Sequence, residues 1–94
     1  MQKVWERIQE LIAARAIHNR KGFNLAEVRP LFVIGQALAE FGELIQEPDD
    51  PEELGDVLCI LLHYAIKKGW TQDDLEQRML RKLEERFTVP TPGD

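Results

Sequence analysis

Residues 39–58 read AEFGELIQEPDDPEELGDVL, and this stretch decides the fold of the chain. A short turn, EPDDP, separates two apolar segments, LFVIGQALA before it and VLCILLHYAI after it. Because the turn is so short, we expect the two segments to form neighbouring antiparallel helices. The same stretch contains an E-x-x-E motif followed by E-x-x-D, with acids at Glu40, Glu43, Glu53 and Asp56. Carboxylates are seldom fully buried unless they are paired or bind metal, so these four predict a counter-charge.

The sequence before the turn predicts two helices. Apolar residues at helical spacing place the first helix at about residues 2–18. The segment HNRKGFN, residues 18–24, then interrupts this pattern with a glycine and two asparagines. Pro30 suits the first turn of the second helix, which we expect to end at about Gln46.

Capping residues define two further helices after the turn. Asp50, which a proline follows, predicts the start of a third helix that ends near Lys68, where Gly69 stops it. Thr71 is expected to cap a fourth helix. Two prolines and a glycine predict a flexible tail at residues 88–94. The expected fold class is therefore all-α, with four helices and no strand.

Length and composition predict one globular domain, residues 1–94. Its formal net charge of −5 argues against a protein that coats nucleic acid. The first residues, MQKVWERIQELIAAR, carry charges throughout, unlike a signal peptide. The longest apolar run, residues 57–62, is far too short to span a membrane. We therefore expect a soluble cytoplasmic protein that binds neither nucleic acid nor a membrane.

The third helix is apolar on nearly every face from Val57 to Ile66, with His63 as the exception. In this run we expect Cys59 to be a small core residue, and His63 to be an interior or interface residue with its hydrogen bonds satisfied. A helix that is apolar all round must be covered all round, and three other short helices can hardly do this. The pattern therefore predicts a second subunit, in a homodimer or homotetramer. The alternative is that this helix forms the centre of a compact monomer.

The register of the hairpin places the acids in two facing pairs. In an antiparallel pair joined by this turn, Glu40 lies level with Asp56 and Glu43 lies level with Glu53. If all four turn toward one groove, like charges repel, and some must take up protons unless cations intervene. Ligation by carboxylates alone favours Mg²⁺, with Mn²⁺ as a possible substitute. The alternative is that Glu53 is an ordinary acid of a first helical turn and that E-x-x-E is a solvated helix face.

With E-x-x-E, a short spacer and EELGD within four helices, the chain resembles the MazG-type all-α nucleoside triphosphate pyrophosphohydrolases. The resemblance covers about residues 25–87, and residues 40–56 are its most specific part. A second matching element is RKLEERF, which places Lys82 and Arg86 four residues apart on the fourth helix. The resemblance implies a four-helix MazG-like bundle that oligomerisation completes.

The activity that the resemblance implies is Mg²⁺-dependent hydrolysis of a nucleoside triphosphate between its α and β phosphates. The products are a monophosphate and pyrophosphate, and the implied role is that of a housecleaning enzyme for non-standard or surplus nucleotides. The four acids of the hairpin would be the metal ligands and catalytic residues, one of them orienting or deprotonating the attacking water. Lys82 and Arg86 would contact the substrate phosphates.

Three residues outside these motifs are candidates for contact with the nucleobase. Trp5 and Phe23 are aromatic side chains that could stack on a base, and Asn19 could bind its edge. For Trp5, packing in the core of the first helix is the alternative. A different class of function is also open, namely a non-catalytic helical dimerisation or nucleotide-sensing module that keeps the acidic, metal-binding groove without turnover.

Overall fold

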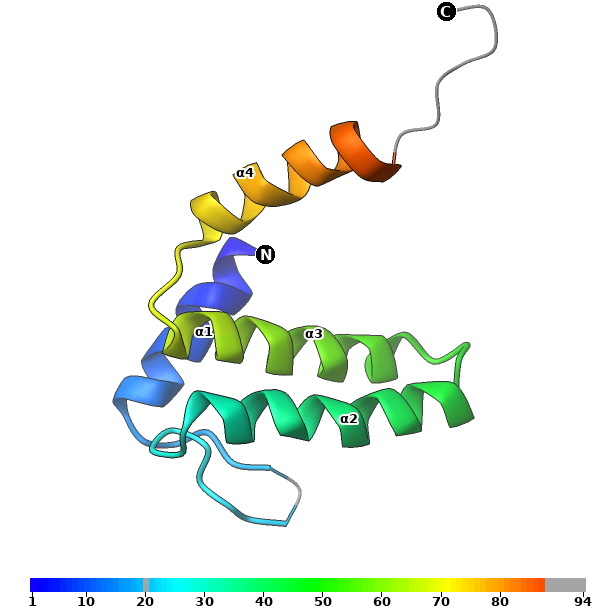
Figure 1. Ribbon diagram of the computed structural model, residues 1–94. Coiled ribbons are helices and arrows are strands. Elements are labelled where there is room, and N and C mark those ends of the chain that lie inside the picture. The colour runs from blue at the N-terminus through cyan, green and yellow to red at the C-terminus, as the bar shows by residue number, and fades with distance from the viewer. Residues whose placement is uncertain (20, 88–94) are drawn as a thin grey trace, which may run out of the picture.

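The computed structural model describes residues 1–19 and 21–87 and contains, in that part of the chain, four α-helices and no β-strand (Figure 1). The helices are α1 (Gln2–Ala13), α2 (Pro30–Gln46), α3 (Pro51–Lys67) and α4 (Gln72–Lys82), and a π-helical turn, η1 (Leu83–Phe87), continues α4. An isolated bridge joins His18 to Asn24 in the segment between α1 and α2. The all-α fold class is therefore confirmed. The predicted tail at residues 88–94 lies outside the described residues.

Local sequence signals explain the hairpin of α2 and α3. Pro30 is the first residue of α2, where its missing N–H costs no intrahelical hydrogen bond. The side chain of Asp50 caps α3 by accepting a hydrogen bond from the backbone N–H of Glu52 at 3.0 Å, and Pro51 follows it. The two helices contact each other along an antiparallel pair (Figure 1). The predicted hairpin and the predicted start of both helices are therefore confirmed.

Gly69 ends α3 in a left-handed conformation. Its φ is +78°, and its N–H donates to the carbonyl of Ile66 at 3.0 Å. The N–H of Trp70 donates to the carbonyl of Ala65 at 3.1 Å, which completes a Schellman motif. The ring of Trp70 meets that of Tyr64 edge-on, with centroids 5.7 Å apart. Gly69 therefore fixes the direction in which the chain leaves α3 toward α4.

Replacing Gly69 with alanine should lower the free energy of unfolding by about 1 kcal/mol, because an L-residue is strained at positive φ. An added Cβ there would meet no atom within 4 Å, so the loss would come from the backbone alone. Gly55→Ala, a helical position that is equally open, should instead stabilise the fold by roughly 0.5–1 kcal/mol. Urea unfolding of both variants checks this, and a Gly69→Ala variant as stable as the wild type would contradict it.

The first helix ends at Ala13, so the prediction that it continues to about residue 18 is wrong. Arg15 follows the helix with φ of +55°, a left-handed conformation that usually selects glycine. The N–H of Ala16 donates to the carbonyl of Leu11 at 2.8 Å, so the helix closes with a second Schellman motif. Since no glycine marks this position, the sequence carried no signal for the earlier end.

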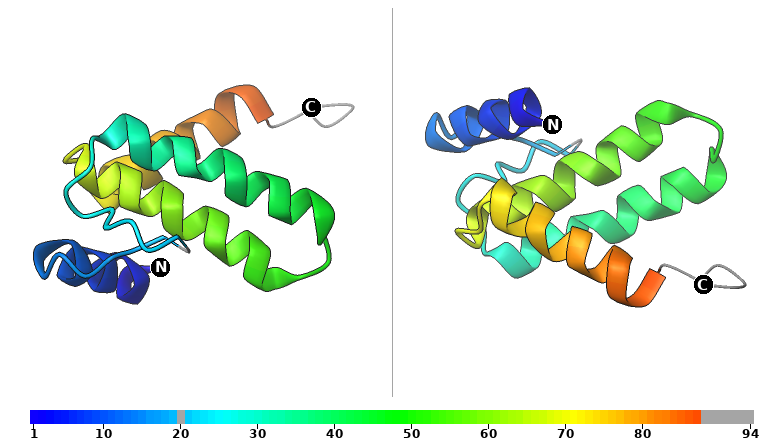
Figure 2. Two further views of the ribbon diagram at one scale, coloured as in Figure 1. Left: turned by 90° about the horizontal axis from the view of Figure 1, so that it is seen from below. Right: turned by 90° about the horizontal axis from the view of Figure 1, so that it is seen from above.

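The core lies between α1, α2, α3 and the segment that joins α1 to α2. Its buried apolar residues are Trp5, Ile8, Leu25, Ala26, Val33, Ala37, Val57 and Ala65. Figures 1 and 2 show α1 against α3, whereas α4 leads away from the hairpin and makes few contacts with the other helices. The radius of gyration is 15.8 Å, compared with roughly 12 Å for a compact domain of this length. One chain therefore does not close into a compact bundle.

The third helix is only partly covered within one chain. Leu54 and Leu58 are 47% and 36% exposed. Cys59 is also exposed, so its predicted place in the core is wrong. The reason is that, within residues 1–19 and 21–87, only α1 and α2 are helices with substantial contacts to α3, which leaves part of its circumference open. Among the described residues, no helix combines the length and the apolar character that crossing a membrane requires.

Candidate metal centre

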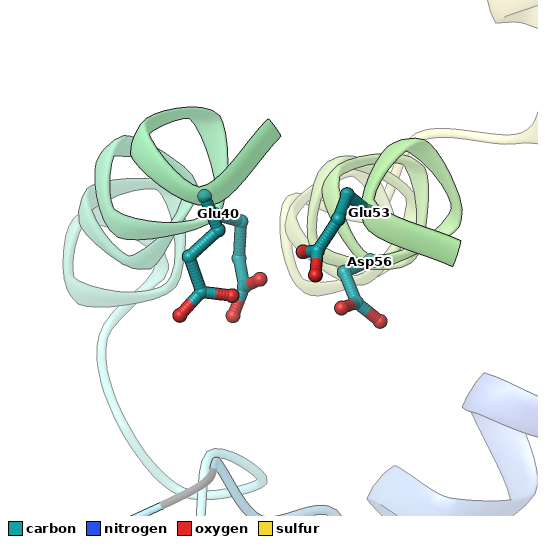
Figure 3. A group of neighbouring side chains, drawn as sticks. Glu40, Glu53 and Asp56 are labelled. Carbon is teal, nitrogen blue, oxygen red and sulfur yellow. The ribbon is translucent and has the colours of Figure 1, made fainter. Parts of the chain in front are cut away.

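Four carboxylates gather on one side of the α2–α3 hairpin. Glu40 and Glu43 come from α2, and Glu53 and Asp56 come from α3. Each offers an oxygen atom, and these atoms all lie within 4.8 Å of one another. In Figure 3 the carboxylates of Glu40, Glu53 and Asp56 point to the same side of the hairpin, toward the segment between α1 and α2. The predicted convergence of the four acids is therefore confirmed.

The geometry of the two helices explains this convergence. Residues three apart on one helix lie on the same face and differ by about 4.5 Å in height. Each motif therefore presents two acids in one direction, and the antiparallel register sets the pairs at equal heights. Because the turn between Gln46 and Pro51 is short and Asp50 caps α3, this register has little freedom to slip.

The chemistry of the cluster suits a hard cation. All four side chains are half-buried, and one oxygen atom of each of Glu40, Glu43 and Glu53 is fully buried. Like charges this close repel strongly where water is partly excluded. Oxygen ligands from carboxylates are those that hard divalent ions prefer. The four acids therefore form a group that could hold a metal ion.

A pocket of about 350 Å³ adjoins the cluster. Its lining residues are Asn19, Lys21, Phe23, Phe32, Gln36, Ala39, Glu40 and Glu43. The structure thus brings two predicted base contacts, Asn19 and Phe23, beside two of the predicted metal ligands. Phe32 and Gln36 are further lining residues that the sequence reasoning missed. Their spacing was a usable signal, because residues 32, 36, 40 and 43 share one face of α2.

Asn19 organises the loop that forms one wall of this pocket. Its Oδ1 accepts hydrogen bonds from the backbone N–H groups of Lys21 at 2.9 Å and Phe23 at 3.0 Å. Its backbone N–H donates to the carbonyl of Phe23 at 3.0 Å, and Gly22 occupies the turn with φ of +85°. Its Nδ2 donates to Oε1 of Gln36 on α2 at 3.1 Å. The loop is therefore tied to the helix that carries Glu40 and Glu43.

The remaining predicted site residues lie elsewhere in the chain. Lys82 is on α4 and Arg86 is on η1, both are exposed, and neither lines the pocket beside the acids. Trp5 is 6% exposed and lines a separate apolar groove with Leu58 and Leu62. Trp5 therefore packs in the core, which was the alternative to contact with a base. Within one chain, Asn19 and Phe23 therefore lie beside the acidic cluster, whereas Lys82 and Arg86 do not line the same pocket.

His63 is fully interior, with 1% of its surface exposed. Neither ring nitrogen has a hydrogen-bond partner in the described part of the chain, so the prediction of a satisfied histidine is wrong. Burial, and to a smaller extent the charge of Lys67, lowers the pKa of His63 from 6.5 to about 4. The Nζ of Lys67 donates instead to the carbonyl of Ala26 at 2.5 Å. His63 is therefore a neutral core residue at pH 7.

Comparison of the chain with protein-family models, with curated proteins and with solved structures gives no match.

Proposed function

We propose that this protein is a Mg²⁺-dependent nucleoside triphosphate pyrophosphohydrolase of the MazG type. The observation that carries the proposal is that the acids of E-x-x-E and E-x-x-D offer oxygen atoms within 4.8 Å of one another from two antiparallel helices. The adjoining pocket supports it further, because an aromatic and amide-lined space beside an acidic metal site suits a nucleotide. The reaction would release a nucleoside monophosphate and pyrophosphate, and the role would be that of a housecleaning enzyme.

The four acids would hold Mg²⁺, or Mn²⁺ as a substitute, since they supply oxygen atoms and no nitrogen or sulfur. A divalent ion held there would neutralise charge on the triphosphate and polarise its phosphoryl oxygens. One carboxylate of the group would orient the attacking water or accept its proton. Because the side chains are half-buried and fixed to two helices, they are positioned before substrate arrives.

Lys82 and Arg86 would bind the substrate phosphates, with Arg able to make two parallel hydrogen bonds and Lys acting as a point charge. In one chain they lie on the elements that lead away from the hairpin (Figure 1). We therefore assign them to an assembly of two or more copies, in which α4 of one subunit packs against a neighbour. Such an assembly would complete the MazG-like four-helix bundle with helices from more than one subunit.

Exposed apolar side chains support this assembly. Leu31, Leu38 and Ile45 on α2 are 78%, 76% and 77% exposed, and their spacing of seven residues places them in one row. On α4, no residue is buried, and Met79 and Leu80 are 63% and 51% exposed. Contiguous apolar surfaces of this kind mark interaction sites. A homodimer or homotetramer would cover them and the open part of α3.

Leu38→Lys should weaken this self-association, because a charge at the centre of an apolar row must be desolvated when a partner covers it. We expect the apparent dissociation constant of the oligomer to rise by at least about tenfold, which corresponds to roughly 1.4 kcal/mol. Gln9→Lys, at an exposed position on α1, is the control and should leave this dissociation constant unchanged. Sedimentation measures both, and a wild-type chain that is monomeric at micromolar concentration would contradict the assembly.

The proposed activity is tested by incubating the purified protein with Mg²⁺ and a panel of standard and modified nucleoside triphosphates. Release of pyrophosphate with the monophosphate supports the proposal. Release of orthophosphate would indicate a different reaction. Absence of turnover across the panel would favour the alternative, a non-catalytic dimerisation or nucleotide-sensing module with an acidic metal-binding groove.

A further inference from the structure

The residues of α2 that line the pocket beside the acidic cluster change in chemical character along the helix. Phe32, Gln36 and Glu40 follow one another at intervals of four residues, about 6 Å along the helix axis, and all three line the pocket. The aromatic residue is thus farthest from the cluster, the amide lies between, and the acid belongs to the cluster itself. This order matches that of a bound nucleotide, whose base lies at one end and whose phosphates lie at the other.

The hydrogen bonds of Asn19 decide which way the amide of Gln36 points. Oδ1 of Asn19 accepts from two backbone N–H groups, which can only donate. The other amide atom of Asn19, which faces Gln36, must therefore be the nitrogen, and it donates to Gln36 at 3.1 Å. Gln36 must meet this donor with its oxygen. A flipped amide at position 36 would set two donors against each other.

As a result, Nε2 of Gln36 is the atom of this amide that is left to donate to a ligand. In residues 1–19 and 21–87, Nε2 of Gln36 donates no hydrogen bond, and the side chain is half-buried at the pocket wall. Two aromatic residues stand in the same pocket, Phe23 at 59% exposure and Phe32 at 45%. The pocket thus combines flat apolar surfaces with a hydrogen-bond donor whose orientation is fixed by Asn19.

From this geometry we infer that the pocket binds the nucleobase and prefers a base with a ring carbonyl over one with an amino group at the same position. The inference rests on the proposed function, since it concerns the base of the same nucleotide. Nε2 of Gln36 donates to the exocyclic oxygen of a keto base, as in uracil or hypoxanthine. An amino group there, as in cytosine or adenine, would place donor against donor and leave both unpaired. Gln36 is the specificity residue, and Asn19 is a positioning residue that holds its amide.

Equilibrium binding of non-hydrolysable nucleotides tests this preference. The probes are the α,β-methylene analogues of UTP, CTP, ITP and ATP with Mg²⁺, measured by calorimetry. The analogues form two pairs, UTP with CTP and ITP with ATP, in which a keto group is exchanged for an amino group. In each pair we expect the keto analogue to bind roughly tenfold more tightly. Equal affinity within both pairs, or tighter binding of the amino analogues, would overturn the inference.

Two variants test the residues separately. Gln36→Glu keeps an oxygen for Asn19 but replaces the donor with an acceptor, so the keto preference should disappear or reverse. Asn19→Asp keeps the acceptor for Lys21 and Phe23 but sets an acceptor in place of the donor against Gln36, so the Gln36 amide should flip to donate to it and the keto preference should disappear or reverse while the loop persists. Gln46→Glu, the same substitution as the first at the exposed end of α2, is the matched control and should retain the preference. Circular dichroism of each variant verifies its helix content.

The outcomes separate this inference from the proposed function. Keto-selective binding without turnover would refute the pyrophosphohydrolase and leave the base preference standing. Turnover with equal use of keto and amino nucleotides, unchanged by Gln36→Glu, would support the enzyme and overturn the base preference. Absence of both binding and turnover would overturn the two together.

Discussion

Replacing Glu53 with glutamine should abolish pyrophosphate release from any nucleotide that the wild-type protein hydrolyses. The substitution keeps the size of the side chain but removes one of the charges from a group whose oxygen atoms lie within 4.8 Å of one another. Loss of residues that merely support metal ligands costs about 10–100-fold in metal affinity or activity. Loss of a ligand should therefore lower kcat/KM by more than about 100-fold, and Asp56→Asn should act in the same way.

The neighbouring residue offers a matched control for this experiment. Glu52 lies in the same first turn of α3 but is exposed and outside the cluster. Glu52→Gln should therefore retain near-normal turnover, and circular dichroism should report unchanged helicity in all three variants. If Glu53→Gln turned over substrate as fast as Glu52→Gln, Glu53 would not be an essential ligand.

Acid should destabilise this protein through His63. The unfolded chain binds a proton at this residue near pH 6.5, whereas burial lowers the pKa of the folded state to about 4. Stability from the neutral imidazole is therefore fully present above pH 6.5 and is lost as the pH falls toward 4. Between pH 7.5 and 5 the free energy of unfolding should fall by about 2 kcal/mol through this group.

Urea unfolding at fixed protein concentration measures this dependence. In the His63→Leu variant the free energy of unfolding should depend less on pH over the same range, because the buried group that must stay neutral is gone. The variant should also be at least as stable as the wild type at pH 7, since two buried nitrogens without partners in the described chain are removed. His18→Gln, at an exposed position, should keep the wild-type slope. An unchanged slope in His63→Leu would refute the role of His63.

The hairpin could be predicted from sequence because its signals are local. Asp50 and the proline after it set the start of α3, and Gly69 sets its end. With the turn length known, the relative heights of the four acids follow from helix geometry. What the periodicity left open was whether both pairs turn to the same side. The packing of α2 against α3 settles this, and Val33 and Ala37 on α2 and Val57 on α3 are buried in the folded chain.

The features that the sequence did not reveal depend on contacts between distant residues or on unusual backbone. The end of α1 depends on Arg15 in a left-handed conformation, where composition would favour glycine. The role of Gln36 depends on a hydrogen bond to Asn19, seventeen residues earlier. The exposure of Cys59 depends on how few helices surround α3 in one chain. The apolar character of α3 predicted that its surface must be buried by other helices, but it did not predict which of its residues stay exposed in one chain.

Electron paramagnetic resonance of Mn²⁺ provides the most direct test of the acidic cluster. Titration of the wild-type protein should show saturable loss of the free Mn²⁺ signal, and excess Mg²⁺ should restore it, because both ions take carboxylate oxygens. Glu53→Gln should weaken this binding at least tenfold, and Glu52→Gln should not. A wild-type protein that leaves the Mn²⁺ signal unchanged, or a Glu53→Gln variant that binds as tightly as the wild type, would contradict a metal centre in this hairpin.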